Sequence, residues 1–311
     1  MNATAGRDRP SGTTARTVAQ AKINLFLRVL ARESSGYHQL ETLFCRLELG
    51  DDVVVRVGVR GRSLDCTGDA TPPEGLGPPE RNLAWRAAVA YANATGWPNE
   101  WAIEIGKRIP VGGGLGGGSA DAGAVLRCLN RLAPSPLADD ELIALAAPLG
   151  ADVPFLATGD ALALGWGRGE RLLALPPLPA RAVTLVCFPF GVSTPDAYGW
   201  LDANERVTRG AARLSVEALA TWAGVARVAH NDFEAVVSSR YPEIERALGE
   251  LRSNAARTDA ATSITLLAGS GATVFSVCDA APAAMTAVHG TSWRLVHTHT
   301  ASRVVAVEVS D

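Results

Sequence analysis

The sequence predicts an α+β protein, and three observations carry this prediction. Segments with alternating apolar residues, typical of β-strands, occur in both halves of the chain. Amphipathic helical segments come in groups between them rather than singly after each strand. One glycine-crowded segment, Pro110–Ser119, leads directly into an apolar helical pattern. Because strand runs and helix groups follow no regular βαβ rhythm, an α+β arrangement is favoured over a doubly wound parallel sheet.

The first half of the chain opens with strand patterns and continues into helices. The alternation of Ile23, Leu25, Leu27 and Val29 predicts a strand over Thr17–Leu30. The other elements that we expect here are strands at Leu40–Leu49 and Asp52–Val59 joined by a hairpin at Gly50-Asp51, a helix at Asn82–Ala94, a strand at Trp101–Ile105, the helix after the glycine segment, a helix at Ala138–Pro148 and a strand at Ala161–Trp166.

The proline-rich stretch Leu175–Pro179 predicts a domain boundary. We expect a disordered tail over residues 1–15, an N-terminal domain over 16–175 and a C-terminal domain over 176–311. The elements predicted in the second half are a strand at Ala182–Phe188, helices at Pro195–Asn204, Ser215–Trp222, Asn231–Ser239 and Pro242–Leu251, strands at Ser263–Leu267 and Ala272–Val277, a helix at Ala281–His289 and strands at Trp293–His297 and Arg303–Glu308.

Composition excludes several classes of protein. The chain has 311 residues, 47% apolar and 20% charged, with a net charge of −3, so a sizeable core is expected and a surface that binds nucleic acid is disfavoured. The five cysteines are scattered without a C-x-x-C pair, which argues against a disulfide framework and for a reducing cytoplasm. No apolar run approaches the ~18 residues that span a bilayer. We therefore expect a cytoplasmic protein without nucleic-acid or membrane partners; its oligomeric state is left open.

The glycine segment has the composition of an anion-binding loop. Glycines let backbone N–H groups approach an anion closely, and the start of a helix adds unpaired N–H donors and a positive dipole end. Ser119 is suited to a helix N-cap, a phosphate contact or a metal contact. A flexible surface loop before a capped helix is the plain alternative, and the immediate amphipathic helix speaks against it.

Two common phosphate-binding loops fit less well. A Walker loop needs a lysine before the serine, and Gly118 stands there. A dinucleotide-binding fingerprint is formally present as Gly112-x-Gly114-x-x-Gly117, with Asp139 and Asp140 about twenty residues on. In a Rossmann unit, however, the acid ends a parallel strand, whereas these two acids are predicted to open a helix. A dehydrogenase is therefore disfavoured.

The glycine segment instead resembles the P-x-G-x-G-L-G-x-S-like loop of the GHMP kinase superfamily. Six further motifs follow the order found in a family of that superfamily whose members phosphorylate 4-diphosphocytidyl-2-C-methyl-D-erythritol. They are Ala21-Lys22-Ile23-Asn24-Leu25, Gly36-Tyr37-His38, Gly150-Ala151-Asp152-Val153-Pro154, Gly167-Arg168-Gly169-Glu170, Asn231-Asp232-Phe233-Glu234 and Gly269-Ser270-Gly271-Ala272. The resemblance extends over roughly Thr17 to Val277, and the ordered set is far more specific than the glycine loop alone.

The resemblance implies a fold and an activity. The fold would be a two-domain GHMP kinase fold, with an N-terminal domain like ribosomal protein S5 and a C-terminal ferredoxin-like α/β sandwich. The activity would be ATP-dependent phosphorylation of the 2-hydroxyl of the cytidine diphosphate sugar alcohol, in the non-mevalonate route to isoprenoid precursors. The chain departs from the family at Ser35, where an aspartate is usual, at Ala120, usually a serine, and at Ala268, usually serine or threonine.

Lys22 and Asp152 are the candidate catalytic residues. Only Lys22 and Lys107 are lysines among 29 basic residues, and arginine does not replace a compact ammonium at a tight site. Lys22 lies in an otherwise apolar strand, where a buried ammonium needs a partner, and Asp152 is the natural one. In the family reading Asp152 accepts the proton of the attacking hydroxyl, while Lys22 keeps this acid ionised.

The resemblance also assigns binding residues. Those expected on the ATP side are Asn82, Lys107, Pro110, Gly112, Gly113, Gly114, Leu115, Gly116, Gly117, Gly118, Ser119, Gly269, Ser270 and Gly271. Those expected on the substrate side, with Asp152, are Asn24, Tyr37, His38, Thr194, Pro195 and Tyr198. ATP implies Mg²⁺, for which Ser119 is a candidate ligand. The pair His297-x-His299 lacks an evident third metal ligand.

Two alternatives stay open at this point. A mevalonate- or homoserine-type kinase shares the glycine loop but leaves Gly36-Tyr37-His38 without a role. A non-catalytic nucleotide-binding or nucleic-acid-binding module could share the N-terminal fold, although the net acidity speaks against it.

Overall fold

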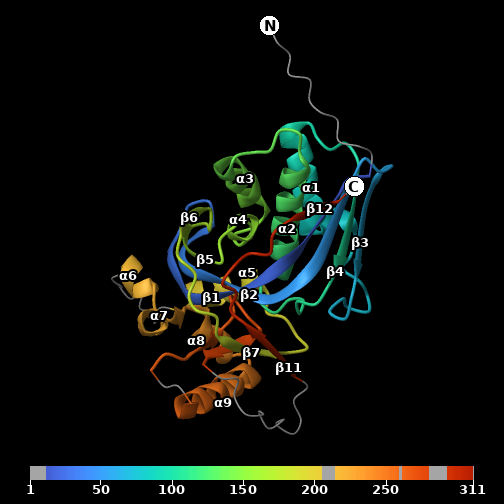
Figure 1. Cartoon of the computed structure of the whole chain (residues 1–311). Helices are drawn as coiled ribbons and strands as arrows, with labels where there is room; N and C mark the ends of the chain where they lie inside the picture. Colours follow the sequence, from blue (N-terminus) through green and yellow to red (C-terminus); the bar gives the residue numbers. More distant parts are fainter. Residues whose placement is uncertain (1–11, 205–213, 259–260, 280–292, 311) are drawn as a thin grey trace.

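The chain forms two antiparallel-rich sheets with helices packed against them (Figure 1). The computed structural model describes residues 12–204, 214–258, 261–279 and 293–310. In the described part the first sheet has eight strands and the second has four, which agrees with the predicted α+β class. The predicted helix at Ala281–His289 and residues 1–11 of the predicted tail lie outside the described residues.

Two long strands, β1 (Thr14–Arg32) and β2 (His38–Val57), form the centre of the first sheet and pair in antiparallel fashion. The order through the sheet is β12-β1-β2-β4-β3; β5 pairs with β2 and β6, and β8 pairs with β1. The remaining strands of this sheet are β3 (Arg62–Thr67), β4 (Trp101–Gly106), β5 (Leu162–Gly167), β6 (Arg171–Ala174), β8 (His230–Asn231) and β12 (Glu308–Ser310).

The prediction of a hairpin at Gly50-Asp51 is wrong, because β2 runs through both residues. Gly50 pairs with Gln20 of β1. A Cβ atom on Gly50 would lie 2.5 Å from the Val18 side chain, so the glycine serves a close strand approach rather than a turn. Strand β1 also begins at Thr14, two residues inside the predicted tail.

Four helices cover one face of the first sheet (Figure 1). They are α1 (Leu83–Thr95), α2 (Gly117–Leu132), α3 (Asp139–Ala146) and α4 (Val153–Ala157); short 3₁₀ turns occur at Pro79–Arg81 and Ala147–Leu149. Helices α1 and α3 agree with the predicted bounds to within two residues, and α2 is the helix predicted after the glycine segment. Strand β4, which precedes the glycine segment, pairs antiparallel with β2, and Asp139 and Asp140 begin α3. This arrangement excludes a Rossmann unit.

The second sheet is antiparallel throughout, in the order β11-β7-β10-β9. Its strands are β7 (Ala182–Cys187), β9 (Ile264–Leu267), β10 (Val274–Cys278) and β11 (Arg294–His299). The helices of this half are α5 (Thr194–Asp202), α6 (Val216–Leu219), α7 (Trp222–Val228), α8 (Phe233–Ser238) and α9 (Pro242–Thr258). No helix among the described residues has the length and apolar character to cross a bilayer.

Several predicted elements of the second half differ from the structure. Helix α9 runs to Thr258 rather than ending at Leu251, and α8 starts at Phe233 because Asn231 belongs to β8. The expected helix at Ser215–Trp222 is two short helices, because Thr221 caps the start of α7 by accepting from the Gly224 N–H. The expected strand at Arg303–Glu308 is regular only from Glu308 onward. Before Glu308, side chains from other elements take the place of strand hydrogen bonds. Gln20 donates to the Arg303 carbonyl, and Thr17 and Arg127 donate to the Val305 carbonyl.

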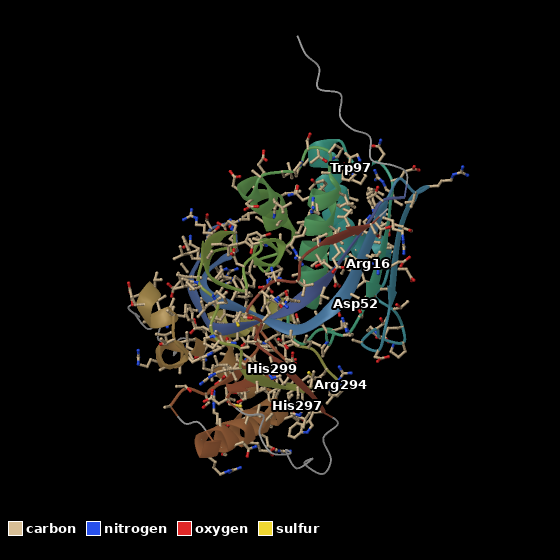
Figure 2. All side chains as sticks on the ribbon, in the orientation of Figure 1. Arg16, Asp52, Trp97, Arg294, His297 and His299 are labelled. Carbon is tan, nitrogen blue, oxygen red and sulfur yellow. The ribbon has the colours of Figure 1, made fainter. Side chains whose placement is uncertain are left out.

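The C-terminal half returns twice to the first sheet. Strand β8 pairs parallel with β1 and β12 pairs antiparallel with it. We propose a domain boundary near residue 175. Strands β8 and β12 then come from the C-terminal half of the chain but pair within the first sheet. His297 and His299 lie in the second sheet, apart from α1–α4 (Figure 2). Among the described residues no group of three or more His, Cys, Asp or Glu could hold a metal ion.

Arg46 of β2 is 1% exposed and holds the C-terminal end of α4. Its guanidinium donates to the carbonyls of Phe155, Thr158 and Asp160 and lies 4.9 Å from the centre of the Phe155 ring. A cation at the carbonyl end of a helix also interacts favourably with the helix dipole. Because Asp152 immediately precedes this helix, Arg46 helps to place it.

We expect Arg46→Met to lower the free energy of unfolding by about 3 kcal/mol or more. The substitution leaves buried carbonyl groups unpaired, and each such group costs about 1–3 kcal/mol. Urea unfolding measures the change. Arg56→Met on the same strand is the control, because the Arg56–Glu104 pair is exposed and such pairs contribute ~0–1 kcal/mol. Equal effects of the two substitutions would contradict the assignment.

Candidate active site

A cavity of about 580 Å³ lies where the glycine segment, β1 and the turn between β9 and β10 meet. Of the residues predicted for the ATP and substrate sites, it is lined by Lys22, Asn24, Asn82, Lys107, Pro110, Gly112–Ser119, Asp152, Thr194, Tyr198, Gly269 and Ser270. The residues that sequence reasoning linked from distant parts of the chain therefore do come together.

A second cavity, of about 1,620 Å³, adjoins the first. It is lined by Tyr37, His38 and Pro195 from the predicted substrate site. Residues that line both cavities are Leu40, Ala151, Thr194 and Tyr198. Gly271 lines neither; a Cβ atom there would face Val192. The predicted site thus consists of two connected spaces, with Ala151 and Thr194 at the junction.

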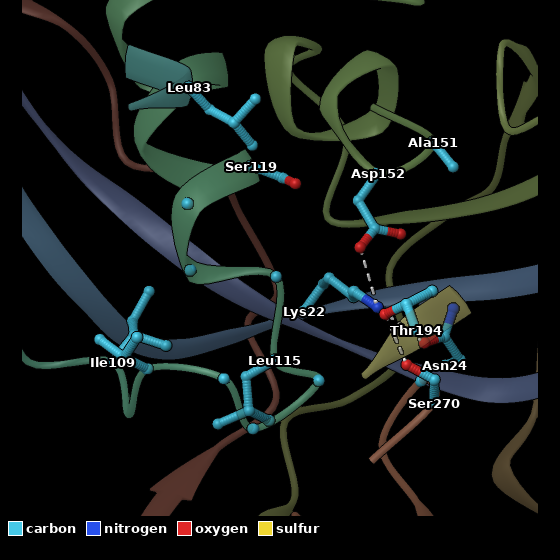
Figure 3. A pocket seen from close by; sticks show the side chains of 18 of the residues that line it. Lys22, Asn24, Leu83, Ile109, Leu115, Ser119, Ala151, Asp152, Thr194 and Ser270 are labelled. Atoms are coloured by element: carbon cyan, nitrogen blue, oxygen red, sulfur yellow. Dashed lines mark hydrogen bonds and ion pairs between the residues drawn. The ribbon is translucent and has the colours of Figure 1, made fainter. Parts of the chain in front are cut away.

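Lys22 and Asp152 face one another in the first cavity (Figure 3). Their Nζ and Oδ2 atoms lie 3.1 Å apart. The Lys22 ammonium, 4% exposed, also donates to Asn24 Oδ1 at 2.9 Å. The Asn24 amide then donates to Thr42 Oγ1, which donates to the Phe26 carbonyl. This chain of hydrogen bonds fixes the orientation of the Asn24 amide and compensates the burial of the ammonium.

At two positions of the glycine segment the neighbouring atoms leave no room for a side chain. Gly116 has a φ of +71°, and a Cβ atom would lie 3.0 Å from two carbons of the Lys22 side chain. Gly114 has a φ of +78°, and a Cβ atom would lie 2.1 Å from the Ala268 carbonyl oxygen. Both positions have the left-handed backbone that favours glycine. The Lys22 N–H also donates to the Leu115 carbonyl, so β1 and the loop are directly bonded.

Helix α2 begins with open N–H groups at the cavity. Its N-cap is Gly116, which has no side chain to cap the first turn. The prediction that Ser119 is suited to the N-cap is therefore wrong in this structure: Ser119 lies within the first turn, and its side chain points toward the space beside Asp152 (Figure 3). Unpaired N–H groups and the positive dipole end at this position favour an anion.

The turn between β9 and β10 lies against the glycine segment. A Cβ atom on Gly269 would be 3.1 Å from the Gly114 carbonyl oxygen and 3.5 Å from Lys22 Nζ. Asn231 holds this turn, because its side-chain amide donates to the carbonyls of Leu267 and Gly269, each at 2.8 Å. Asn231 belongs to a motif that the sequence singled out without a role; its role here is to position the turn.

Lys107 is part of a buried ion cluster. Its ammonium pairs with Asp51 and with Asp121, the latter at 2.6 Å. Asp51 Oδ1 also accepts from the N–H groups of Arg108 and Ile109. Burial raises the pKa of the Asp121 carboxyl to about 7, and the two carboxylates together raise the pKa of Lys107 despite its burial. The cluster joins β2, the base of the glycine segment and α2, so Lys107 lines the cavity while its charge is already paired.

The second cavity contains an aromatic and polar cluster. Tyr37 is 61% exposed, and the Arg168 guanidinium lies 4.3 Å from its ring centre. Arg168 also pairs with Glu33 and donates a hydrogen bond to the Ser35 hydroxyl. Ser35, which stands where an aspartate is usual, therefore still bonds to this arginine. The turn that carries Arg168 backs onto the segment before Asp152: a Cβ on Gly169 would lie 2.1 Å from the Ala151 carbonyl oxygen.

Comparison with known proteins identifies the family of this chain. A curated relative from Deinococcus radiodurans, named 4-diphosphocytidyl-2-C-methyl-D-erythritol kinase, is 39% identical over 277 residues, 88% of each chain. The chain belongs to this kinase family. The family model "GHMP kinases N terminal domain" matches residues 82–160, which include the glycine segment and Asp152.

Solved structures agree with the assignment to this family of GHMP kinases. A crystal structure of 4-(cytidine 5'-diphospho)-2C-methyl-D-erythritol kinase is 35% identical, with a TM-score of 0.67, and the match covers 85% of this chain and 90% of that one. Homoserine kinase from Cytophaga hutchinsonii gives a TM-score of 0.64 at 16% identity, over 98% of this chain and 99% of that one. At this identity the second match shows the shared fold alone. The predicted two-domain GHMP kinase fold is confirmed.

Sequence reasoning missed several residues of the candidate site. Asp51, Asp121 and Thr42 are polar residues within apolar strand or helix patterns, and that signal was present in the sequence. Asp202, whose Oδ1 lies 2.8 Å from His38 Nε2, gave no local signal, because it lies 164 residues from its partner. Only the fold brings such a pair together.

We expect Gly114→Ala to lower the free energy of unfolding of this kinase by at least about 1–2 kcal/mol, the cost of a left-handed backbone in a residue with a Cβ atom. The clash with the Ala268 carbonyl adds to this cost and displaces the turn that carries Gly269. Denaturant unfolding provides the measurement. In Gly249→Ala, a control in helix α9 where a Cβ meets open space, stability should rise by about 0.5–1 kcal/mol. A neutral Gly114→Ala would be inconsistent with the close packing.

Proposed function

We propose that the chain transfers the γ-phosphoryl group of ATP to the 2-hydroxyl group of 4-diphosphocytidyl-2-C-methyl-D-erythritol. The observation that carries the proposal is the Lys22–Asp152 pair, 3.1 Å apart, beside a glycine segment that leads into a helix N-terminus. Phosphoryl transfer to an alcohol requires a cradle for the phosphates, an in-line hydroxyl and a group that accepts its proton. The first cavity offers the cradle and the acceptor together.

The nucleotide fits the donor set of this cavity. The first-turn N–H groups of α2 have no side-chain cap, and the glycines before and within this turn line the cavity. Asn82 and Lys107 also line this cavity and are assigned to the adenine side. Ser119 offers an oxygen atom that would help to hold Mg²⁺ together with the phosphates. When bound, the metal ion would offset the negative charge of the phosphoryl group.

The second cavity suits the cytidine end of the acceptor. Tyr37, His38 and Tyr198 offer aromatic surfaces and an imidazole, and stacking of a base on such a ring contributes ~1–3 kcal/mol. Asn24, Thr194 and Pro195 lie at or near the junction and are assigned to the linking part of the substrate. A nucleotide-linked alcohol that spans the junction would place its hydroxyl beside Asp152.

In this proposal Asp152 Oδ accepts the proton of the 2-hydroxyl as its oxygen bonds to the γ-phosphorus atom. The bond from that phosphorus to the β–γ bridging oxygen breaks, and ADP leaves. Two of the three Lys22 N–H donors go to Asp152 and Asn24, and the third is available for an oxygen of the transferred group. The ammonium thus orients the proton acceptor and compensates negative charge near the reacting atoms. Because these groups are held by β1 and by the start of α4, little rearrangement is needed at the moment of transfer.

We expect Asp152→Asn to lower kcat by about 10²–10⁴, the usual contribution of a positioned base, while KM for ATP changes little. Lys22→Met should lower kcat as well. The measurement is steady-state ADP release at saturating substrates. Asp140→Asn, on the exposed start of α3, serves as the matched control. Near wild-type turnover in both Asp152→Asn and Lys22→Met would exclude this mechanism.

Substrate choice is tested by ADP release with 4-diphosphocytidyl-2-C-methyl-D-erythritol, mevalonate and homoserine as separate acceptors. We expect turnover with the cytidine compound and little with the other two, because only it occupies both cavities. Phosphorus NMR of the product locates the new phosphate. Preferred turnover of mevalonate or homoserine would contradict the proposed acceptor but not the kinase activity. ADP release that does not depend on any acceptor would contradict the proposed acceptor and the kinase activity alike.

A further inference from the structure

Two side chains of helix α5 contact the imidazole of His38. Helix α5 carries Tyr198 and Asp202 four residues apart, which places both side chains on the same face. The Tyr198 ring stacks on the His38 ring with centroids 4.4 Å apart and planes at 19°. Asp202 Oδ1 lies 2.8 Å from His38 Nε2. The His38 side chain is 7% exposed, so the ring is held firmly at the wall of the second cavity.

The Asp202 contact determines which ring nitrogen of His38 carries hydrogen. An ionised carboxylate only accepts hydrogen bonds, so Nε2 must be the N–H donor in this pair. In a neutral imidazole the other nitrogen, Nδ1, is then an acceptor with a free lone pair. Arg32 lies opposite His38 in the β1–β2 register, and its guanidinium pairs with Asp202 Oδ2 at 3.5 Å.

Nδ1 of His38 remains available for a ligand. Across residues 12–204, 214–258, 261–279 and 293–310, no side chain or backbone group forms a hydrogen bond with this atom. The nitrogen belongs to a residue that lines the cavity assigned to the pyrimidine base. Its chemistry therefore bears on which base is accepted. Cytosine offers an exocyclic amine, which is a donor, at the position where uracil has a carbonyl oxygen, which is an acceptor.

We propose that Asp202 is a positioning residue that sets the preference of this site for cytosine over uracil, by holding His38 with its hydrogen on Nε2 and its lone pair on Nδ1. The lone pair complements the cytosine amine and opposes the uracil O4 atom. A site that pairs with a substrate N–H discriminates against an analogue that lacks it, because the buried partner is left unsatisfied. This proposal rests on the proposed function, since it takes His38 as a contact of the base.

The kinetic test compares the cytidine and uridine forms of the diphospho-methylerythritol substrate under identical conditions. Asp202→Asn offers both an acceptor and a donor to Nε2, so both tautomers of His38 become accessible. We expect the cytidine-to-uridine ratio of kcat/KM to fall about 10-fold, the equivalent of one hydrogen bond, while kcat with the cytidine substrate stays near that of the wild type. Asp202→Leu should lower the ratio similarly.

The matched control is Asp196→Asn, on the exposed first turn of the same helix. This variant should keep the wild-type ratio. A merely structural role for Asp202 would raise KM for both substrates equally and leave the ratio unchanged, and that result would overturn the proposal.

The tautomer itself is read by ¹⁵N NMR of the histidine-labelled protein. The chain has five histidines, and His38→Gln assigns the signal of interest. We expect the wild type to show hydrogen on Nε2 and Asp202→Asn to show a mixture. Hydrogen on Nδ1 in the wild type, or an unchanged spectrum in the variant, would overturn the proposal. This measurement needs no substrate: if neither the cytidine nor the uridine compound is turned over, the proposed function fails while the Asp202–His38 relation is still decided.

Discussion

The burial of one ammonium group is the constraint around which this molecule is arranged. Lys22 lies on the central strand of the first sheet, almost fully removed from water, and an unpaired charge there would be strongly unfavourable. Asp152 and Asn24 pair with it, and the start of α4 and the β1–β2 ladder hold these partners. Because the ammonium must also face the space for a phosphate, the surrounding backbone has to approach it without side chains.

That close approach explains why two glycine-rich turns from opposite halves of the chain meet here. A Cβ atom on Gly116 would lie 3.0 Å from the Lys22 side chain, and one on Gly269 would lie 3.5 Å from Lys22 Nζ, so at both positions the backbone faces the lysine. Asn231 secures the second turn, and its neighbour Asp232 accepts from the Val29 N–H of the strand that carries Lys22. The site is therefore composite, and the second sheet contributes to it through its connecting turns rather than through its strands.

A continuous set of contacts links the two cavities. Thr194 Oγ1, at the start of α5, lies 2.9 Å from Ser270 Oγ in the second glycine turn (Figure 3). The same helix continues to Tyr198 and Asp202, which contact His38. On the other side, the turn around Gly169 packs on Ala151, next to Asp152. The groups assigned to base recognition and those assigned to phosphoryl transfer thus share supporting elements, which suits a substrate that must reach from one cavity into the other.

The sequence by itself determined the chemistry that is local in the chain. It predicted the α+β class, the glycine segment before a helix, and the need of an isolated lysine in an apolar strand for an acidic partner. These follow from residue type and spacing, which can be read without a fold, whereas the role of the distant Asp152 rested on the resemblance to the kinase family. It misplaced a turn at Gly50, because a glycine that permits close strand packing has the same local signature as one that permits a turn. It gave no sign of Asp202, whose relation to His38 spans 164 residues. Tertiary structure alone decided such relations, because hydrogen bonding and ion pairing depend on distances of a few ångströms, and the packing of distant elements sets those distances.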